Sequence, residues 1–524
     1  MIKMIIRRVH VLFLLDNDKK RKLDILNAIY KAPYHRISFH TLQQDMKLST
    51  VTLTTALSQL IDDIEEICTE SIILEYRQGN QKWYELPEKQ HFIQTQLRQY
   101  YMQNSIKFHL IKDLFLNNGG TLTGFSQTYF LSPSKITREI KELNTMLVKH
   151  HLQVEGFKQL KLSGTESSIR YFFVHLFFHT YQGLDWPFTN MNPFLVKYYH
   201  ELFPKKLYRL LDVKGNLFAS YIVAISLTRC AQAHYLESSM SLDWLYEDAS
   251  LPDFEEKTER FILYLLNDSQ YSATRDVLVK EVRFIYSFVF SQQTFIDDNT
   301  DIPSFFFNEA LESFQYMQNV DYILERLAFL FERELDDRTR RIWRYHLTVI
   351  HYRLLLFPEI LVTLPAYWTV DFLTIIEKDL YYQLTYERIH GNLTIFHEAL
   401  NEQHLDYLTR AYSVLTMPYV SSYFMKHTMK VLFLTNNTDF HFLHKALTSE
   451  FARIYLRIEA VEMGNPDTDV IISDTLVNPT LLELPADIPI IYYETNAYFD
   501  YLNHIQNQLF QIQLRKNGLE NRKK

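Results

Sequence analysis

Three basic side chains, Lys135, Arg138 and Lys141, follow one another at helical spacing in the segment LSPSKITREIKEL. Cationic side chains release counterions when they contact phosphates, and an arginine can donate two hydrogen bonds to the edge of a guanine. Three hydroxyl side chains, which can hydrogen-bond phosphates or bases, accompany them: Ser132, Ser134 and Thr137. These residue types at this spacing predict a helix face that contacts DNA.

The surrounding residues have the pattern of a helix-turn-helix that would present this face. Ser132 is a good N-cap and Pro133 suits the first helical position, so a helix is expected to begin there. The buried side of that helix is indicated by four apolar residues: Ile136, Ile140, Leu143 and Leu147. A preceding helix is expected over residues 121–129, with a tight turn at residues 130–132.

Two strand-like runs, LQVEG and FKQLKLSG, follow this helix and place Lys158 and Lys161 near a hairpin. A longer helix, from Ser105, precedes the pair. The order helix, helix, turn, helix, hairpin is the layout of a winged helix-turn-helix, in which the second helix of the pair enters a DNA groove. Lys158 and Lys161 are therefore added to the predicted DNA contacts.

An earlier segment, FHTLQQDMKLSTVTLTTALSQLIDDI from Phe39, repeats the pattern. Ser49 corresponds to Ser132, 83 residues later, and the apolar stripe recurs at Leu53, Leu57 and Leu60. The polar side of this copy has no lysine or arginine, and its candidate DNA contacts are hydroxyl residues: Thr50, Thr52 and Thr54. Hydroxyl groups give no counterion release, so we predict that the second copy makes the main DNA contact.

The distribution of charge agrees with a DNA-binding site in the first third of the chain. The 524 residues carry a formal net charge of −8, which by itself argues against a nucleic-acid partner. Residues 1–184, however, contain 23 Lys and Arg against 17 Asp and Glu, while the remainder contains 31 against 45. A basic surface is the electrostatic footprint of nucleic-acid binding, and only the first third has the surplus for one.

Composition argues against several other classes of protein. The two cysteines, Cys68 and Cys230, have no metal-ligand spacing, which argues against a zinc site or a disulfide framework and favours a reducing cytoplasm. No apolar run is long enough to cross a membrane, and no phosphate loop, dinucleotide fingerprint or H-E-x-x-H motif is present. We therefore expect no enzyme, no cofactor and no metal.

A second possible chemistry lies in the stretch RRIWRYHLTVIHYRLLLF, residues 340–357, where His346 and Arg353 are about two helical turns apart on one side. A neutral imidazole is a nucleophile toward a phosphoryl donor, and a neighbouring arginine can pair with the charge that is added. Histidines on helices are more often structural, so the spacing alone leaves both interpretations open.

The last segment alternates strands and helices. Buried-strand runs begin near Met429, Arg453, Asp467 and Ile488, with a helix after the first of them. This order predicts a small parallel α/β domain. The turn after its first strand, TNNTD, has neither a thiol nor a glycine-rich cradle, so we interpret the domain as one for protein interaction or dimerisation.

The order of these parts resembles the Mga family, transcriptional regulators of Gram-positive bacteria that include the streptococcal M-protein activator and the anthrax toxin activator. The most specific part of the resemblance is LKLSGTESSIRYFF, residues 160–173, followed by YQGLDWPF. The resemblance implies that the helical middle consists of two phosphotransferase-system regulation domains and that the end is similar to the IIB component of a sugar permease. It also implies a phosphocarrier protein of that system as a possible partner.

The resemblance also implies which histidines could accept a phosphoryl group. Regulation domains often contain H-I-x-F-A-I-x-R, and HLTVIHYR fits its spacing with His346 first and His351 inside it. The corresponding run of the first domain, IVAISLTR, has Ile222 in that place, which leaves His200 and His234 as its weaker candidates. The missing cysteine argues that the last domain resembles a IIB fold without its phosphoryl chemistry.

The expected fold is mainly α and multidomain. Its predicted parts are a first winged helix-turn-helix at 1–88, a second at 89–185, helical regulation domains at 186–302 and 303–426, a IIB-like α/β domain at 427–512 and a polar tail at 513–524. We predict a cytoplasmic activator of virulence, colonisation or metabolic genes that binds promoter DNA and forms a homodimer through the α/β domain. The alternatives are a protein-interaction hub without DNA binding and a phosphotransfer enzyme.

Overall fold

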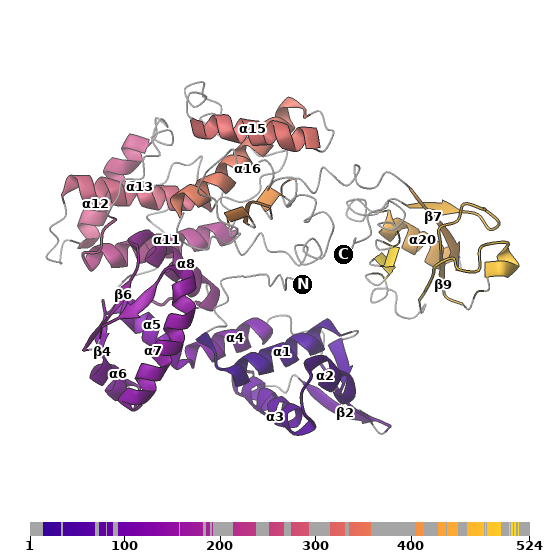
Figure 1. Cartoon of the computed structure of the whole chain (residues 1–524), viewed down its shortest axis with the longest axis horizontal. Coiled ribbons are helices and arrows are strands. Elements are labelled where there is room, and N and C mark those ends of the chain that lie inside the picture. Colours follow the sequence, from indigo (N-terminus) through magenta and orange to yellow (C-terminus); the bar gives the residue numbers. More distant parts are fainter. Residues whose placement is uncertain are drawn as a thin grey trace. The chain divides into compact units, whose positions relative to one another are not determined.

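In the residues that it describes, the computed structural model is mainly helical and has three small sheets (Figure 1). It describes residues 14–32, 35–68, 73–79, 81–86, 93–156, 158–181, 185–188, 191, 213–236, 251–266, 274–292, 315–330, 335–357, 428–435, 437–448, 458–475, 477, 479–493 and single positions within 404–415 and 502–512. The chain divides into two compact units, Met1–Gln318 with Tyr345–Thr369, and Asn319–Arg344 with Val370–Lys524. The expected mainly α fold class is confirmed.

The first unit begins with a group of elements that we call the first repeat. It comprises α1 (Asn17–Lys31), β1 (Arg36–Ser38), α2 (Phe39–Met46), α3 (Thr50–Ile67), β2 (Leu74–Gln78) and β3 (Gln81–Glu85). The strands form an antiparallel sheet in the order β1-β3-β2, with Tyr76 opposite Trp83. The predicted apolar stripe of α3 is confirmed, because Leu53, Leu57 and Leu60 are all buried.

The second repeat has the same elements in the same order. It comprises α5 (Ile106–Leu116), β4 (Gly120–Thr121), α6 (Leu122–Thr128), α7 (Pro133–Leu147), β5 (Gln153–Glu155) and β6 (Gln159–Ser163), with a short 3-10 turn at Val148–His150. The sheet order β4-β6-β5 matches the order β1-β3-β2, and both of its pairings are antiparallel. The two repeats therefore share a strand order as well as a helix order.

Local backbone signals of the two repeats coincide at a separation of 83 residues. Three pairs of residues hold equivalent positions: the N-caps Ser38 and Thr121, the left-handed residues Lys47 and Phe130, and the N-caps Ser49 and Ser132. Hydroxyl side chains at these caps accept hydrogen bonds from backbone N–H groups that the helix leaves without partners. The separation of 83 residues between Ser49 and Ser132 therefore holds along both helix pairs.

Two helices connect the repeats to each other and to the rest of the first unit. Helix α4 (Ile93–Gln103) packs on α1 and α3, and Tyr101 donates a hydrogen bond from its hydroxyl group to Asp63 of α3. Helix α8 (Glu166–Tyr181) is buried over almost its whole length. It stacks Phe173 on Phe115 of α5, at 4.1 Å between ring centroids, so the second repeat is packed firmly against α8.

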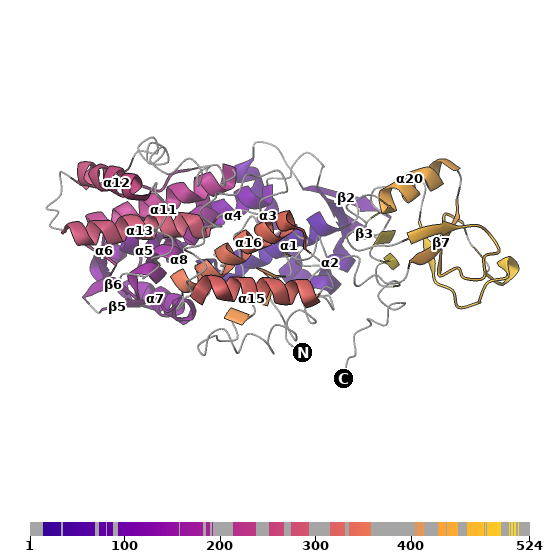
Figure 2. The same ribbon diagram turned by 90° about the horizontal axis from the view of Figure 1, so that it is seen from above.

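Longer helices continue the first unit beyond α8. These are α11 (Val213–Ala231), α12 (Leu251–Leu266), α13 (Arg275–Ser291) and the part of α16 (Asp337–Leu356) from Tyr345 on. Helix α11 packs against α8 and α13, and both views show α11 running beside α13 (Figures 1 and 2). Tyr171 of α8 and Phe357, just after α16, lie 4.6 Å apart between ring centroids. Helix α15 (Gln315–Leu330) belongs largely to the second unit.

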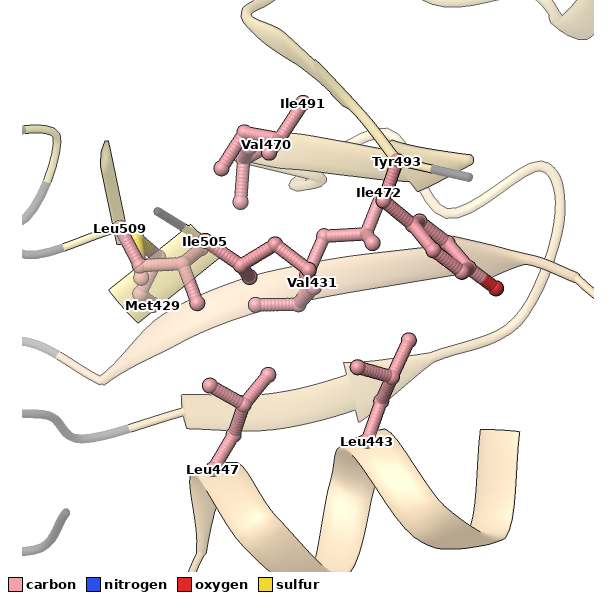
Figure 3. Close-up of a cluster of buried hydrophobic side chains, with 10 residues drawn as sticks. All are labelled: Met429, Val431, Leu443, Leu447, Val470, Ile472, Ile491, Tyr493, Ile505 and Leu509. Carbon is pink, nitrogen blue, oxygen red and sulfur yellow. The ribbon is translucent and has the colours of Figure 1, made fainter. Parts of the chain in front are cut away.

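The second unit contains a four-stranded sheet of β7 (Met429–Leu434), β8 (Ile458–Val461), β9 (Val470–Ser473) and β10 (Ile490–Tyr492). All three pairings are parallel, in the order β10-β9-β7-β8, so the predicted parallel α/β arrangement is confirmed for these residues. Val431 faces Leu443 and Leu447 of α20 (Asn437–Leu447), as Figure 3 shows. Leu432 packs on the opposite face with Leu484, so both faces of the sheet are covered.

Candidate nucleic-acid interface

Helix α7 begins where the sequence predicted. The Ser132 hydroxyl accepts a hydrogen bond from the Lys135 backbone N–H at 3.3 Å, and Pro133 occupies the first helical position. The four predicted apolar residues are buried: Ile136, Ile140, Leu143 and Leu147. The opposite side of the helix faces solvent and carries most of the predicted DNA contacts in exposed positions: Ser132, Ser134, Thr137, Arg138 and Lys141.

Lys135 differs from the other cations of α7 because its ammonium group makes a close ion pair within the helix. Its Nζ lies 2.5 Å from Oε1 of Glu139, one turn further along α7, and its side chain is 38% exposed. The sequence pattern assigned Glu139 neither to the buried side nor to the polar side of the helix. Its side chain is only 2% exposed. Lys107 of α5 approaches the other carboxylate oxygen at 3.1 Å. The Arg138 guanidinium group lies further from Oε1, at 4.0 Å, and 63% of its side chain is exposed. Lys135 therefore neutralises a buried carboxylate closely, whereas Arg138 and Lys141 keep exposed cationic groups on the predicted face.

The Glu139 carboxylate is held in its charged form by these lysines. Burial raises the pKa of Glu139, but hydrogen bonds from Lys135 and Lys107 outweigh burial, and the pKa lies below its ordinary value. Lys107 also contacts Asp16 at 2.9 Å and Glu142 at 3.0 Å. The cluster joins α5 to α7, because one buried ammonium group bonds carboxylates on both sides of it.

The hairpin after α7 is attached to that helix by a side-chain amide. Asn144 donates to the Val154 carbonyl at 2.9 Å and accepts from the Val154 backbone N–H at 2.7 Å. Gly156 begins the connection between β5 and β6 with φ of 102°, and a Cβ there would lie 1.8 Å from the Gln159 carbonyl oxygen. Lys158 and Lys161 are both exposed on this hairpin, so their predicted positions are compatible with DNA contact.

The equivalent face of the first repeat has no cations. Thr50 and Thr54 of α3 are exposed, while Thr52 is half-buried beside Ser49, with 2.8 Å between the two hydroxyl oxygens. Thr50 accepts a hydrogen bond from Gln43 of α2 at 3.1 Å. This repeat presents a similar helix, but its polar face consists of hydroxyl groups that partly bond one another.

The candidate histidines that the structure describes differ in accessibility. His346 and His351 lie on α16 with exposures of 1% and 5%, and Arg353 is fully buried, with its guanidinium group bonded to the Ser291 carbonyl. The sequence placed His346 and Arg353 on one side of a helix without indicating that this side is interior. A phosphoryl donor would reach His346 only if this helix were displaced. His200 lies outside the described residues.

His234 lies at the junction between the second repeat and the helical part of the first unit. Its Nε2 is 2.6 Å from the Asn118 side-chain oxygen, and its ring is half-buried. Burial and the nearby Arg229 lower the pKa of His234, so its imidazole is neutral near pH 7. Among the three candidates that the structure describes, His234 combines partial exposure with a contact to the repeat that carries α7.

A buried ion network reinforces that junction. Arg170 of α8 is fully buried and bonds Glu281 of α13 at 2.5 Å and Glu166 at 2.9 Å. Arg229 of α11 completes the group through Glu166 at 2.8 Å. Two guanidinium groups thus compensate two buried carboxylates, which is the condition under which buried charges are tolerated.

The junction also reaches the helix that supports α7. The side-chain amide of Gln232, just after α11, donates to the Phe115 and Leu116 carbonyl groups of α5, at 2.9 and 3.0 Å. These carbonyls belong to the last turn of α5, whose oxygens have no partners within the helix. Since Lys107 of the same helix bonds Glu139 of α7, a continuous set of contacts runs from α11 to the predicted DNA-binding face. Sequence reasoning did not find it.

The described residues lack two features that would point to a membrane or a metal ion as a partner. None of the helices that the structure describes is both long enough and apolar enough to span a membrane. Within the same residues, no group of three or more His, Cys, Asp or Glu side chains is arranged to hold a metal ion.

Comparison with known proteins identifies the second repeat. Residues 90–177 match the Mga helix-turn-helix domain, a stretch that begins before α4 and ends within α8. It therefore contains the whole second repeat, including Arg138, Lys141 and both hairpin lysines. The resemblance to Mga-type regulators is thereby confirmed, and the matched segment includes the repeat that carries the cationic face.

Three relatives share part of their length with this chain. A candidate trans-acting regulator of Streptococcus pneumoniae is 22% identical over 271 residues, which cover 50% of this chain and 51% of the relative. The capsule synthesis positive regulators AcpA and AcpB of Bacillus anthracis are 21% identical over 234 residues and 22% identical over 240. These alignments cover 45% and 46% of this chain, and 46% and 48% of the relatives. The chain thus spans about half the length of the curated relatives it matches.

Proposed function

We propose that this chain, which is similar to Mga-type regulators, is a positive regulator of transcription that binds double-stranded promoter DNA through α7. The observation that carries the proposal is the exposed face formed by Arg138 and Lys141 within the segment that matches the Mga helix-turn-helix domain. Arg138 can contact a guanine edge or a phosphate, and Lys141 a phosphate. The names of the three relatives support regulation rather than catalysis.

The other predicted DNA contacts are proposed to contribute less to DNA affinity than Arg138 and Lys141. Lys158 and Lys161 on the hairpin add phosphate contacts beside α7, as a wing does. Lys135 mainly supports the fold through Glu139, since its ammonium group is already paired. Thr50, Thr52 and Thr54 of the first repeat contribute weaker, uncharged hydrogen bonds. The hydroxyl face of α3 would extend the DNA contact without adding to its dependence on salt.

Fluorescence anisotropy with the full-length protein and promoter-length duplexes at several salt concentrations tests DNA binding. The Arg138→Ala, Lys141→Ala double variant should lose affinity and reduce the slope of log affinity against log salt by about two, one for each phosphate contact. The matched control is Thr55→Ala, Ser58→Ala, which changes the equivalent exposed positions of α3 and should leave the slope unchanged.

The competing interpretation is a protein-interaction hub in which the repeats bind protein and not DNA. It predicts that the wild type shows no salt-dependent binding to duplexes of any sequence. Retention of the full salt slope by the Arg138→Ala, Lys141→Ala variant would have a different meaning: the protein would bind DNA through another surface.

Regulation by histidine phosphorylation is the second part of the proposal. His234 is the candidate that its surroundings favour, because a phosphoryl group on its ring would add negative charge beside Asn118 and near Glu166. Contacts from α11 through α5 would carry the change to α7. His346, His351 and His200 remain predicted phosphoryl acceptors. The proposed phosphoryl donor is a phosphocarrier protein of the phosphotransferase system.

Mass spectrometry after incubation with a phosphoenolpyruvate-dependent phosphocarrier system would locate the modified histidine. Phosphate on His234 that disappears in His234→Ala and persists in His346→Ala supports this order of candidates. Modification of His346 alone would reverse it.

We further propose that the α/β part of the second unit supports a homodimer, which would double the DNA contacts as in other helix-turn-helix proteins. Sedimentation of the chain with and without residues 427–512 tests this, because a dimer that survives the deletion must form elsewhere. The two capsule regulators among the relatives favour target genes of the cell surface or colonisation.

A further inference from the structure

Phe130, between α6 and α7, combines two unfavourable features. Its side chain is 94% exposed, although a phenyl ring is stabilised by burial. Its backbone lies in the left-handed region with φ of 53°, where a residue with a Cβ is disfavoured and glycine or asparagine is common. An aromatic residue in this conformation, held out in solvent, has a cost for folding and no packing benefit within the described structure.

The turn that presents Phe130 is well fixed. The Leu131 backbone N–H donates to the Ser126 carbonyl at 3.1 Å, and the Ser126 hydroxyl donates to the Leu131 carbonyl. Tyr129 is bonded through its backbone to Phe125 at 3.0 Å and through its hydroxyl to Asp113. Phe130 is therefore exposed although the residues on either side of it, Tyr129 and Leu131, are held by hydrogen bonds.

Phe130 also lies at the end of α7 that matters for base contacts. It stands two residues before the N-cap Ser132, and in helix-turn-helix proteins the N-terminal residues of the second helix contact base edges. Exposed hydroxyl groups follow it at Ser132 and Ser134, and Arg138, with 63% of its side chain exposed, lies further along α7. The major groove offers one apolar group among its polar base edges, the methyl group of thymine.

We infer that the Phe130 ring contacts thymine methyl groups in the major groove and makes the protein prefer A·T pairs beside the α7 site. This inference rests on the proposed function and deepens it. Arg138 and Lys141 would supply phosphate and guanine contacts, and Phe130 a base-specific contact that does not depend on charge. Phe130 is thus a specificity-determining residue for DNA binding.

The surroundings favour DNA over a protein surface as the partner of this ring. Protein docking sites need a contiguous apolar patch of several residues. Within the described part of the second repeat, the other exposed large hydrophobic residue is Val148, which follows the opposite end of α7. A single ring followed by the exposed hydroxyl groups of Ser132 and Ser134 matches the mixed apolar and polar edge of an A·T pair.

The test compares two otherwise identical duplexes rich in A·T pairs, one with thymine and one with uracil in its place, which removes only the methyl groups. The wild-type full chain should bind the uracil duplex about fourfold more weakly for each methyl group contacted, the value of one buried methylene-sized group. Phe130→Gly should bind both duplexes equally. Lys47→Gly, the matched change at the equivalent left-handed position of the first repeat, should keep the wild-type ratio.

Phe130→Gly removes a side chain from a left-handed position, so its unfolding temperature should not fall, and a loss of methyl discrimination cannot be assigned to unfolding. Equal discrimination by wild type and Phe130→Gly, or none by wild type on a duplex that it binds with a salt slope, overturns the inference and leaves the proposed function intact. Absence of any duplex binding overturns both. If Phe130→Gly bound both duplexes as the wild type does but activated transcription less, Phe130 would be a protein contact, and the inference would also be overturned.

Discussion

The first and second repeats are built alike and differ on the face that each would present to DNA. Both have a helix pair joined through a left-handed residue, a serine N-cap on the second helix and a three-stranded sheet of the same order. At the position of Arg138 the first repeat has Thr55, and at that of Lys141 it has Ser58. The common features are those that the fold requires, whereas the differences lie at exposed positions that the fold leaves open.

The repeats also differ in how they use a buried lysine. In the first repeat Lys22 of α1 bonds Asp63 near the end of α3, where the carboxylate side chain keeps 21% exposure. In the second repeat Lys107 bonds Glu139 in the middle of α7, and the Glu139 side chain is only 2% exposed. The buried Glu139 also engages Lys135. The number of basic residues in a sequence therefore overstates the charge that is free to meet a phosphate.

The largest effect should come from removing the buried lysines one at a time. Lys107→Met leaves Glu139 buried with Lys135 at 2.5 Å and Arg138 at 4.0 Å as its remaining cations, and should cost about 3 kcal/mol of unfolding free energy. Lys22→Met leaves the more exposed Asp63, which keeps its bond from Tyr101, and should cost about 1 kcal/mol. Urea unfolding of both variants measures the difference, and equal losses would show that the two clusters are equivalent.

The same cluster predicts a dependence on pH. Because the pKa of Glu139 in the folded protein lies below its ordinary value of 4.5, its contribution to stability is present above that pH. As pH falls below 4.5, the unfolded state binds a proton before the folded state does, and the contribution is lost. Thermal unfolding between pH 6 and 3, roughly the span of carboxylate titration, should show a smaller acid-side decrease for Glu139→Gln than for wild type. Identical profiles would contradict this assignment.

The next effect in size should come from adding to the first repeat the two cations that α7 carries. Thr55→Arg with Ser58→Lys places the two missing cations on exposed positions of α3. If α3 lies against DNA, the slope of log affinity against log salt should increase by about two, and affinity at low salt should rise about tenfold. Anisotropy titrations measure both. An unchanged slope would mean that only the second repeat reaches the duplex.

The N-caps should give smaller and equal effects. Ser49→Ala and Ser132→Ala each remove a hydroxyl acceptor from a backbone N–H, at 3.1 Å from Thr52 and 3.3 Å from Lys135, and should each cost about 1 kcal/mol. Chemical unfolding of the two variants provides the measurement. A marked inequality would break the structural equivalence inferred from the common separation of 83 residues.

The smallest effect concerns the left-handed residues. Lys47→Gly and Phe130→Gly should each raise the unfolding free energy by about 0.5 kcal/mol, because relief of the strained backbone slightly exceeds the entropy that glycine loses on folding. Differential scanning fluorimetry would detect the direction. Destabilisation by Phe130→Gly alone would indicate that its ring has a packing partner in the folded protein.

Much of both repeats could be predicted because their signals are local. The N-caps at Ser49 and Ser132 and the apolar stripes that follow them depend on residues a few positions apart, and both helices begin as expected. The parallel α/β arrangement was likewise predictable from buried-strand runs that alternate with a helix. Strands β1 and β4 were not predicted, because two or three residues give no periodicity and their pairing depends on distant partners.

The sequence by itself determined where the helices of each repeat begin, which of their sides is apolar, and that only the second repeat carries cations on its polar side. Tertiary structure alone decided that Lys135 is paired with a buried Glu139, that His346 is interior and that Phe130 is exposed. It also joined Arg170 to Glu281, which lie 111 residues apart. Burial and ion pairing depend on which surfaces come together in space, and no local pattern of residues records that information.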